Sequence, residues 1–143
     1  MRCNGQDVVA AARRWIGTPF HHMGRNRYGL DCAGLIVVVA AECGLLSEVR
    51  LPRYGRVPRP HLLVPTMQRY LRQVPESEVA PGDVLLFRVR QHPQHVAIYS
   101  ERAGEPHFVH AYEPIGRTDE TRFDARWEAA LLSVWKWPEL EEN

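Results

Sequence analysis

The feature that most constrains the fold is an almost unbroken apolar run between Asp31 and Gly44, with the sequence DCAGLIVVVAAECG. A run this continuous does not suit a strand with one face in water, and its length favours a helix over a buried strand. Asp31 has the position of a helix N-cap, and Gly44 has that of a C-terminal glycine. We therefore expect a buried helix that begins near Cys32.

Helical patterns also lie on either side of this run. Asn4 is followed three residues later by Asp7, and the apolar spacing of VVAAARRWI then predicts a first helix that ends by Gly17. Residues 17–31 contain three glycines and a proline, which predicts an irregular loop of the kind that often carries functional sites. A short amphipathic helix is expected over residues 64–74.

Later segments favour strands. The segments APGDVLLFRV, HVAIYS, HFVHAY and SVWKW are rich in β-forming residues and are separated by turn residues, whereas residues 126–131 are ambiguous. Helices followed by an antiparallel sheet predict the α+β class, with N-terminal helices packed on one face of the sheet. No repeat is visible, so residues 1–143 are expected to form one domain.

Composition excludes several classes of function. The chain has 18 basic and 17 acidic side chains, interspersed along its length, so we expect no nucleic-acid partner. The chain has three cysteines, an odd number, and no two of them form a CxxC pair: Cys3, Cys32 and Cys43. This pattern argues against a disulfide framework and against a zinc site built on thiolates. The thiols are therefore expected to be reduced. No apolar stretch suits membrane insertion or a signal peptide, so synthesis in the cytoplasm is expected.

An arginine-bearing stretch follows the apolar run. Arg50, Arg53, Arg56 and Arg59 recur at every third position among prolines. In a polyproline-like chain they would share one face, which would suit an acidic partner. The alternative is a solvated loop, and this interpretation is favoured.

Cys32 has a position that can support nucleophilic chemistry. The unpaired N–H groups and the dipole at a helix start favour a thiolate, although the charge of the neighbouring Asp31 opposes it. Asp31 is therefore expected to cap the helix or to hold the loop. Taken alone, a cysteine at the start of an apolar helix is more often a core residue. A histidine base is required for the catalytic interpretation.

Strand alternation selects two of the seven histidines. If residues 95–100 and 105–110 form an antiparallel hairpin through residues 101–104, His95 lies opposite His110. Both then stand at one end of the sheet. An imidazole beside a second imidazole suits a base whose tautomer is held by a polar ring.

Other histidines and the C-terminal tryptophans have simpler interpretations. No HExxH motif or carboxylate-flanked histidine pair is present, so no metal site is expected, and surface positions are favoured for His21, His22, His92 and His107. Three tryptophans could stack on sugar rings, but core or sheet-edge packing is favoured: Trp127, Trp135 and Trp137.

Five motifs in order resemble one known family, the NlpC-type cell-wall cysteine peptidases, a papain-like group that cleaves peptidoglycan stem peptides. They are GTPF at 17–20, DCAGL at 31–35, GDVLLF at 82–87, HVAIY at 95–99 and VHA at 109–111. The resemblance covers most of the chain and implies a papain-like NlpC-type fold.

The resemblance also implies roles for individual residues. Cys32 would be the nucleophile, His95 the general base and later acid, and His110 the polar residue that orients His95. The family commonly has a tyrosine hydroxyl near the oxyanion where this chain has Phe20. Either backbone N–H groups and His21 or His22 substitute for it, or the activity is weak. Asp31 and His22 are predicted to contact substrate, and no metal or organic cofactor is implied.

The implied function is that of a peptidoglycan endopeptidase. The loop spacing and the arginine-bearing insert resemble variants from phage tails and gene-transfer particles, which implies a virion tail-tip location and tail hub or tail-tip partners. An alternative is a structural tail-tip protein that retains the fold with little or no catalysis. Acyl transfer or amidase action on the same scaffold is a further alternative.

Overall fold

The structure of the protein is a computed structural model that describes residues 3–46, 60–89, 92–138 and 140. The side chains of residues 60–62 and 92–93 are outside this description. The arginine-bearing stretch at 50–59 also lies outside it, so the predicted arginine face stays a prediction.

Helices and strands follow the chain in the predicted order, helices before the main sheet. The α-helices are α1 (Gly5–Arg13), α2 (Cys32–Glu42), α3 (Pro60–Tyr70) and α4 (Ala125–Ala130). The strands are β1 (Arg25–Asn26), β2 (Gly29–Leu30), β3 (Arg72–Val74), β4 (Val84–Val89), β5 (His92–Arg102), β6 (Glu105–Tyr112), β7 (Arg117–Arg122) and β8 (Leu131–Lys136).

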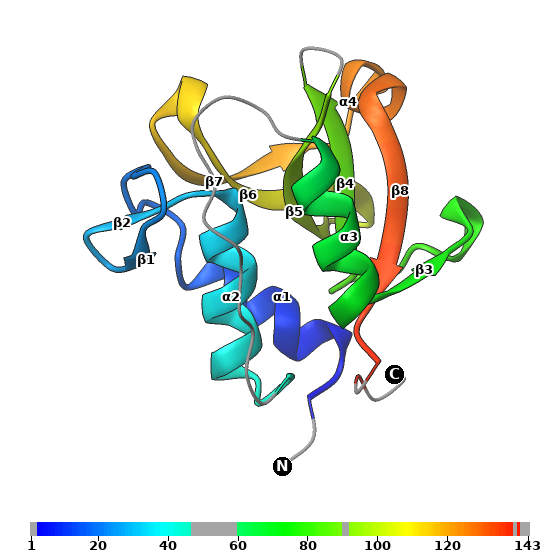
Figure 1. Ribbon diagram of the computed structural model, residues 1–143, viewed down its shortest axis with the longest axis horizontal. Helices are drawn as coiled ribbons and strands as arrows, with labels where there is room; N and C mark the ends of the chain where they lie inside the picture. The colour runs from blue at the N-terminus through cyan, green and yellow to red at the C-terminus, as the bar shows by residue number, and fades with distance from the viewer. Residues whose placement is uncertain (1–2, 47–59, 90–91, 139, 141–143) are drawn as a thin grey trace.

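The main sheet has six antiparallel strands in the order β3-β8-β4-β5-β6-β7, and β1 and β2 form a separate small hairpin. Helices α1, α2 and α3 contact the central strand β5, as Figure 1 shows. The short helix α4 contacts β4 and carries Trp127 onto the opposite face. The α+β prediction is confirmed, but the expectation of helices on one face only was incomplete because α4 covers the other.

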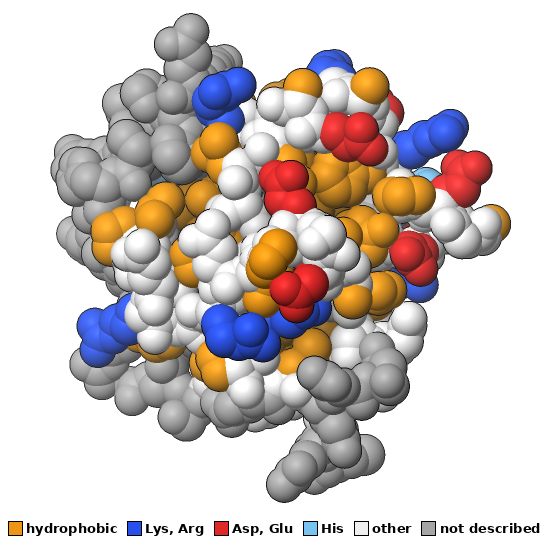
Figure 2. Space-filling view, turned by 90° about the vertical axis from the view of Figure 1, so that its right-hand side faces the viewer, with side chains coloured by type: hydrophobic (Ala, Val, Ile, Leu, Met, Phe, Trp, Pro, Cys, Tyr) orange, Lys and Arg blue, Asp and Glu red, His pale blue; other side chains and the backbone are white. Residues whose placement is uncertain are grey.

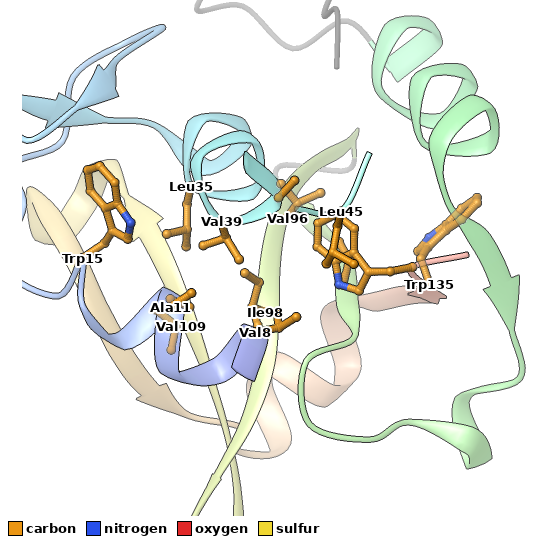
Figure 3. Close-up of a cluster of buried hydrophobic side chains, with 14 of the residues drawn as sticks. Val8, Ala11, Trp15, Leu35, Val39, Leu45, Val96, Ile98, Val109 and Trp135 are labelled. Atoms are coloured by element: carbon orange, nitrogen blue, oxygen red, sulfur yellow. The ribbon is translucent and has the colours of Figure 1, made fainter. Parts of the chain in front are cut away.

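The larger core lies between the helices and the sheet (Figure 3). Apolar side chains from the two N-terminal helices meet the inward residues of β5 and β6; they include Val8, Ala11, Leu35, Val39, Val96, Ile98 and Val109. Leu35 and Val39 are fully buried, whereas Ile36, Val37 and Val38 keep partial exposure. Helix α2 is thus buried along one side, which anchors its N-terminus against β5.

A second, aromatic core lies on the other face of the sheet. The Phe87 ring is 4.9 Å from the Trp127 ring and 5.1 Å from the Phe108 ring, centroid to centroid. Trp127 is only 6% exposed, and Trp135 and Trp137 are buried as well. The prediction of core packing for the tryptophans is confirmed.

Two local predictions differ from the structure. The helix expected over 64–74 is α3, which begins at Pro60 and ends at Tyr70, and residues 72–74 form β3 because they pair with β8. Strand β7, with the polar sequence RTDETR, was not predicted. It is one of the two edge strands of the sheet, and it lacks the apolar alternation that marks a half-buried strand.

The start of α1 follows the predicted capping pattern. The Asn4 side chain accepts a hydrogen bond from the Asp7 N–H at 3.0 Å, and the Asp7 carboxylate accepts from the Asn4 N–H at 3.0 Å. This reciprocal capping box satisfies two N–H groups that a helix start otherwise leaves unpaired.

Figure 2 shows acidic and basic side chains interspersed with hydrophobic ones on the face beside β3 and β8. This distribution agrees with the nearly even numbers of acidic and basic residues in the sequence. Within the described residues, no helix combines the length and the apolar character needed to cross a bilayer.

Candidate active site

Cys32 is the first residue of α2, as predicted. Asp31 is the N-cap, and its Oδ1 accepts a hydrogen bond from the Gly34 N–H at 2.8 Å. The cap fixes where the helix begins and so places Cys32 in its first turn.

The Asp31 carboxylate also holds the preceding loop. Its Oδ2 accepts from the Met23 N–H at 2.8 Å, and its Oδ1 accepts from Arg25 Nη1 at 3.1 Å. The side chain is buried. Its expected role as helix cap and loop anchor is confirmed, whereas its predicted contact with substrate stays a prediction.

Glycines allow this loop to lie directly against the start of α2. A Cβ atom on Gly34 would collide with the carbonyl oxygen of Gly24, and one on Gly29 would collide with the Cβ of His21. The loop therefore approaches the cysteine helix more closely than a side chain at position 34 would permit, and Gly29 lets the loop fold closely on itself.

The GTPF segment connects the loop to the sheet. The Gly17 N–H donates to the Thr118 carbonyl at 2.9 Å, and the Phe20 N–H donates to the Gly116 carbonyl at 2.9 Å. Phe20 itself is half-buried and packs against the helix-side core. These bonds place the loop between β7 and α2.

The Cys32 thiol lies beside strand β5 at the position of His95. Its Sγ donates a weak hydrogen bond to the Gln94 carbonyl at 3.8 Å and accepts one from the Val96 N–H. The residue is partly exposed, unlike the buried Cys3. The sulfur thus contacts the backbone on either side of His95.

Burial, together with the charge of Asp31, raises the pKa of the Cys32 thiol to about 11. Hydrogen bonds from backbone N–H groups, including those of Val96 and Ala33, act in the opposite direction. The expected directions of the N–H groups and of Asp31 are both present, but desolvation, which the sequence did not reveal, outweighs the N–H groups. Cys32 rests as a neutral thiol.

His95 and His110 are directly hydrogen-bonded. His95 Nε2 lies 2.8 Å from His110 Nδ1, and both rings are buried, His110 completely. Sequence reasoning thus brought together the correct pair of histidines.

The predicted register was off by two residues. Ile98 pairs with Val109, and the hairpin turns through Ala103 and Gly104, both of which have positive φ. His110 is therefore diagonal to His95 rather than opposite. An even shift keeps side chains on the same face of the sheet, which is why the two rings still meet.

Both imidazoles are neutral at pH 7. Burial lowers the pKa of His95 well below 6.5, and the neighbouring His110 lowers it further. Burial also lowers the pKa of His110 to about 4, although the charge of Asp119 opposes this shift. A neutral imidazole retains one unprotonated ring nitrogen, so it can accept a proton.

Aromatic rings surround the histidine pair, and sequence reasoning missed their role. The His95 ring lies 5.0 Å from Tyr112, 5.9 Å from Trp127 and 6.2 Å from Phe87, between centroids. The alternation of HFVHAY could have placed Tyr112 on the same face as His110. The packing of Trp127 could not have been found this way, because it depends on α4.

Thr121 is a second residue that was missed. Its Oγ1 lies 2.8 Å from His110 Nε2, on the side of that ring away from His95. Because β7 was not predicted, no pattern in the sequence pointed to this contact.

The other histidines lie in varied surroundings. His22 is half-exposed in the loop that precedes α2, and its carbonyl accepts a hydrogen bond from His21 Nδ1 at 3.0 Å. The predicted substrate contact of His22 stays a prediction. His107 Nδ1 donates to the Glu105 carbonyl at 3.0 Å. Among the described residues, no three His, Cys, Asp or Glu side chains are grouped as a metal site would require.

The remaining two cysteines contact each other. Cys3 is buried and Cys43 is half-buried, and both are free thiols. Burial and a hydrogen bond with Cys3 together raise the pKa of Cys43 to about 12. The Cys43 thiol is therefore not ionised at neutral pH.

Comparison with known proteins gives consistent results. The pattern of the NlpC/P60 family matches residues 17–136. The protein named probable endopeptidase NlpC from Escherichia coli K12 is 28% identical over 116 residues, which cover 80% of this chain and 66% of that protein. The chain thus spans just under two thirds of that relative's length.

Two solved structures show the same fold. The NlpC/p60 domain of the peptidoglycan hydrolase SagA has a TM-score of 0.63 and 24% identity, covering 92% of this chain and 97% of that one. An NlpC/P60 family protein from Bacillus cereus has a TM-score of 0.72 and 16% identity, covering 99% of this chain and 42% of that one. These structures support the predicted arrangement of helices on an antiparallel sheet.

Proposed function

This chain belongs to the NlpC/P60 family, and from that premise we propose that it hydrolyses amide bonds in the stem peptides of peptidoglycan, with Cys32 as nucleophile. The observation that carries the proposal is the position of the Cys32 thiol beside the backbone of His95, whose ring is hydrogen-bonded to His110. The names of family relatives, an endopeptidase and a peptidoglycan hydrolase, support the substrate class.

In the proposed reaction, His95 first acts as a base. It takes the proton of the Cys32 thiol while the sulfur attacks the carbonyl carbon of the scissile amide. His95 then protonates the departing amine as the carbon–nitrogen bond breaks, which leaves a thioester on Cys32. Water, deprotonated by His95, attacks the thioester and releases the carboxylate product together with the free thiol.

The protonation states at rest support this sequence of steps. With a thiol pKa of about 11 and a neutral His95, proton transfer has to accompany attack rather than precede it. His110 holds Nε2 of His95, which leaves Nδ1 as the nitrogen available to the thiol. His95 is thereby the proposed general base and acid, and His110 is its positioning residue.

The test is release of soluble fragments from purified peptidoglycan. Wild-type protein should release them, and Cys32→Ala should reduce the rate by at least about 10³-fold, because the nucleophile is lost. Cys43→Ala is the matched control and should retain the wild-type rate. Release by Cys32→Ala at the wild-type rate would overturn the proposal.

We further propose that the protein acts at the tail tip of a phage-like or gene-transfer particle, where it opens the cell wall and contacts tail hub or tail-tip proteins. The support is the resemblance of the GTPF-to-DC spacing and of the arginine-bearing insert to tail-associated members. Purified particles should contain the chain when analysed by mass spectrometry, and immunogold should label one end. Absence of the chain from intact particles would contradict this location.

A second candidate function is structural, with little or no catalysis. Two observations favour it: Phe20 lacks the hydroxyl expected near the oxyanion, and the Cys32 thiol has a strongly raised pKa. It predicts that the wild-type protein releases no fragments and that particles carrying Cys32→Ala assemble and infect normally. Loss of infection in that variant would reject this candidate.

A further inference from the structure

We propose that Thr121 is a positioning residue for the histidine pair: its hydroxyl holds His110 in the tautomer that keeps Nδ1 of His95 unprotonated. Nothing in the sequence motifs or in the family comparison assigns a role to this residue. The inference deepens the proposed function, since it concerns the same base.

The geometry is a continuous chain of hydrogen bonds across three neighbouring strands. His95 Nε2 lies 2.8 Å from His110 Nδ1, and His110 Nε2 lies 2.8 Å from Thr121 Oγ1. The three residues come from β5, β6 and β7, which are adjacent in the sheet. Thr121 pairs with Phe108, two residues from His110, so the threonine side chain projects from the same face.

The chain permits only two arrangements of protons while both imidazoles are neutral, because each ring then has one N–H and one lone pair. In the first arrangement, His95 Nε2–H donates to His110, and His110 Nε2–H donates to the Thr121 oxygen. In the second, all donors reverse: the Thr121 hydroxyl donates to His110, and His110 Nδ1–H donates to His95. Only the first leaves Nδ1 of His95 free.

The first arrangement is the one that suits a base. When His95 takes the thiol proton on Nδ1, its Nε2–H still donates to His110, and no bond in the chain has to reverse. In the second arrangement Nδ1 already carries a proton and cannot accept another. The Thr121 hydroxyl can pair with His110 in either arrangement, but its loss affects them differently. Without it, the first arrangement leaves a buried N–H with no acceptor, whereas the second leaves only a ring lone pair without a donor, and buried unpaired N–H groups are the rarer and costlier case.

Thr118 provides a matched control on the same strand. It is fully buried, and within the described part of the chain its Oγ1 has no hydrogen-bond partner. It is three residues from Thr121, so it lies on the opposite face of β7. Replacing either threonine by valine removes one hydroxyl and keeps the shape, but only Thr121→Val removes a contact to a histidine.

The experiment is ¹⁵N NMR of the imidazole nitrogens in histidine-labelled protein, with His95 and His110 assigned by substitution, alongside steady-state hydrolysis of a stem peptide. Wild type should show protons on Nε2 of both rings. Thr121→Val should move His95 toward the Nδ1–H tautomer and lower kcat about tenfold with little change in KM. Thr121→Ser should restore both properties, and Thr118→Val should change neither.

Two results would overturn the proposal: a wild-type spectrum with His95 protonated at Nδ1, or unchanged tautomers in Thr121→Val. The wild-type spectrum tests it even if the valine variant does not fold. The spectra also test the role of Thr121 independently of the proposed hydrolysis. If wild type hydrolyses no stem peptide but Thr121→Val still shifts the tautomers, the hydrolytic function fails and the role of Thr121 stands.

Discussion

At the residue scale, opposing effects act on the sulfur of Cys32. Backbone N–H groups at the start of α2 and on Val96 favour a thiolate, while burial and the charge of Asp31 favour the thiol. Burial and the charge of Asp31 have the larger effect, so the pKa of the Cys32 thiol rises to about 11. Asp31 is the N-cap that places the cysteine, and the same carboxylate therefore makes the thiol harder to ionise.

This balance predicts how Cys32 reacts with iodoacetamide in the absence of substrate. The reactive thiolate fraction should rise about tenfold for each pH unit between 7 and 10, because the pKa lies near 11. Peptide mass spectrometry of the alkylated protein would report Cys32 separately from Cys43. A rate that reaches a plateau by pH 8 would contradict the prediction and would indicate a thiolate–imidazolium pair at rest.

At the element scale, the site depends on the close contact between α2 and the loop that precedes it. Gly34 allows the two backbones to approach, Gly24 and Gly29 keep the loop itself compact, and Asp31 bonds to both the loop and the helix. The loop is also bonded to β7 through Gly17 and to the residue before β7 through Phe20. The position of Cys32 relative to β5 is thus set by backbone contacts rather than by the cysteine itself.

Gly34→Ala should therefore destabilise the protein although alanine is the better helix former. The added Cβ would collide with the Gly24 carbonyl, and we expect a loss of about 2 kcal/mol in the free energy of unfolding. Urea denaturation measures this loss. Gly44→Ala is the control: it has open space but a positive φ, so about 1 kcal/mol is expected. Equal stability of Gly34→Ala and wild type would disprove the close packing.

Elements with strong local signals could be predicted from the sequence. The caps at Asn4 and Asp31 and the runs of β-forming residues at 84–89 and 95–100 correspond to α1, α2, β4 and β5. By contrast, β3 and β7 exist because they pair with β8 and β6, and their own residues carry no clear strand pattern. Tertiary pairing overrides local preference in both.

The same distinction applies to the candidate site. Cys32, His95 and His110 stand in short motifs, so the sequence could indicate them as a set. Thr121, Tyr112 and Trp127 contact the histidines through pairing or packing across the sheet. An even error in register left the histidine pair intact, whereas an odd one would have separated it.

At the scale of the whole molecule, Glu120 connects the helices to the sheet. Its buried carboxylate accepts hydrogen bonds from Arg13 of α1 at 2.9 Å and from Ser100 and Arg102 of β5 at 2.6 Å each. Burial alone would raise the pKa of Glu120, but these bonds together lower it to about 2. The folded state therefore binds the Glu120 proton less tightly than the unfolded state does.

This difference predicts that the free energy of unfolding decreases at acidic pH. Because the folded pKa is depressed, the contribution of Glu120 is fully present above about pH 4.5 and is lost as pH falls toward 2. Glu120→Gln should lower the free energy of unfolding at pH 7 by about 2 kcal/mol and should make that free energy depend less on pH between 2 and 4.5. Urea titrations from pH 2 to 7 would measure both effects.

Glu105→Gln is the matched control, since its ion pair with Arg122 is largely exposed. It should change stability by less than about 0.5 kcal/mol. If Glu120→Gln and Glu105→Gln changed the free energy of unfolding equally, the bonds of Glu120 between the helices and the sheet would contribute nothing to stability. The histidine pair contributes separately. Both pKa values are depressed, so stability falls as pH drops below about 6.5 and the unfolded histidines take up protons; for His110 this loss continues to its folded pKa of about 4.

The measurement that tests the central claim most directly is mass spectrometry of muropeptides after digestion of peptidoglycan by wild type, Cys32→Ala and Cys43→Ala. We predict that wild type and Cys43→Ala generate new amino and carboxyl termini within the stem peptide, and that Cys32→Ala generates none. Stem peptides cut equally by Cys32→Ala, or left intact by the wild type, would contradict the assignment of Cys32 as the nucleophile of a stem-peptide endopeptidase.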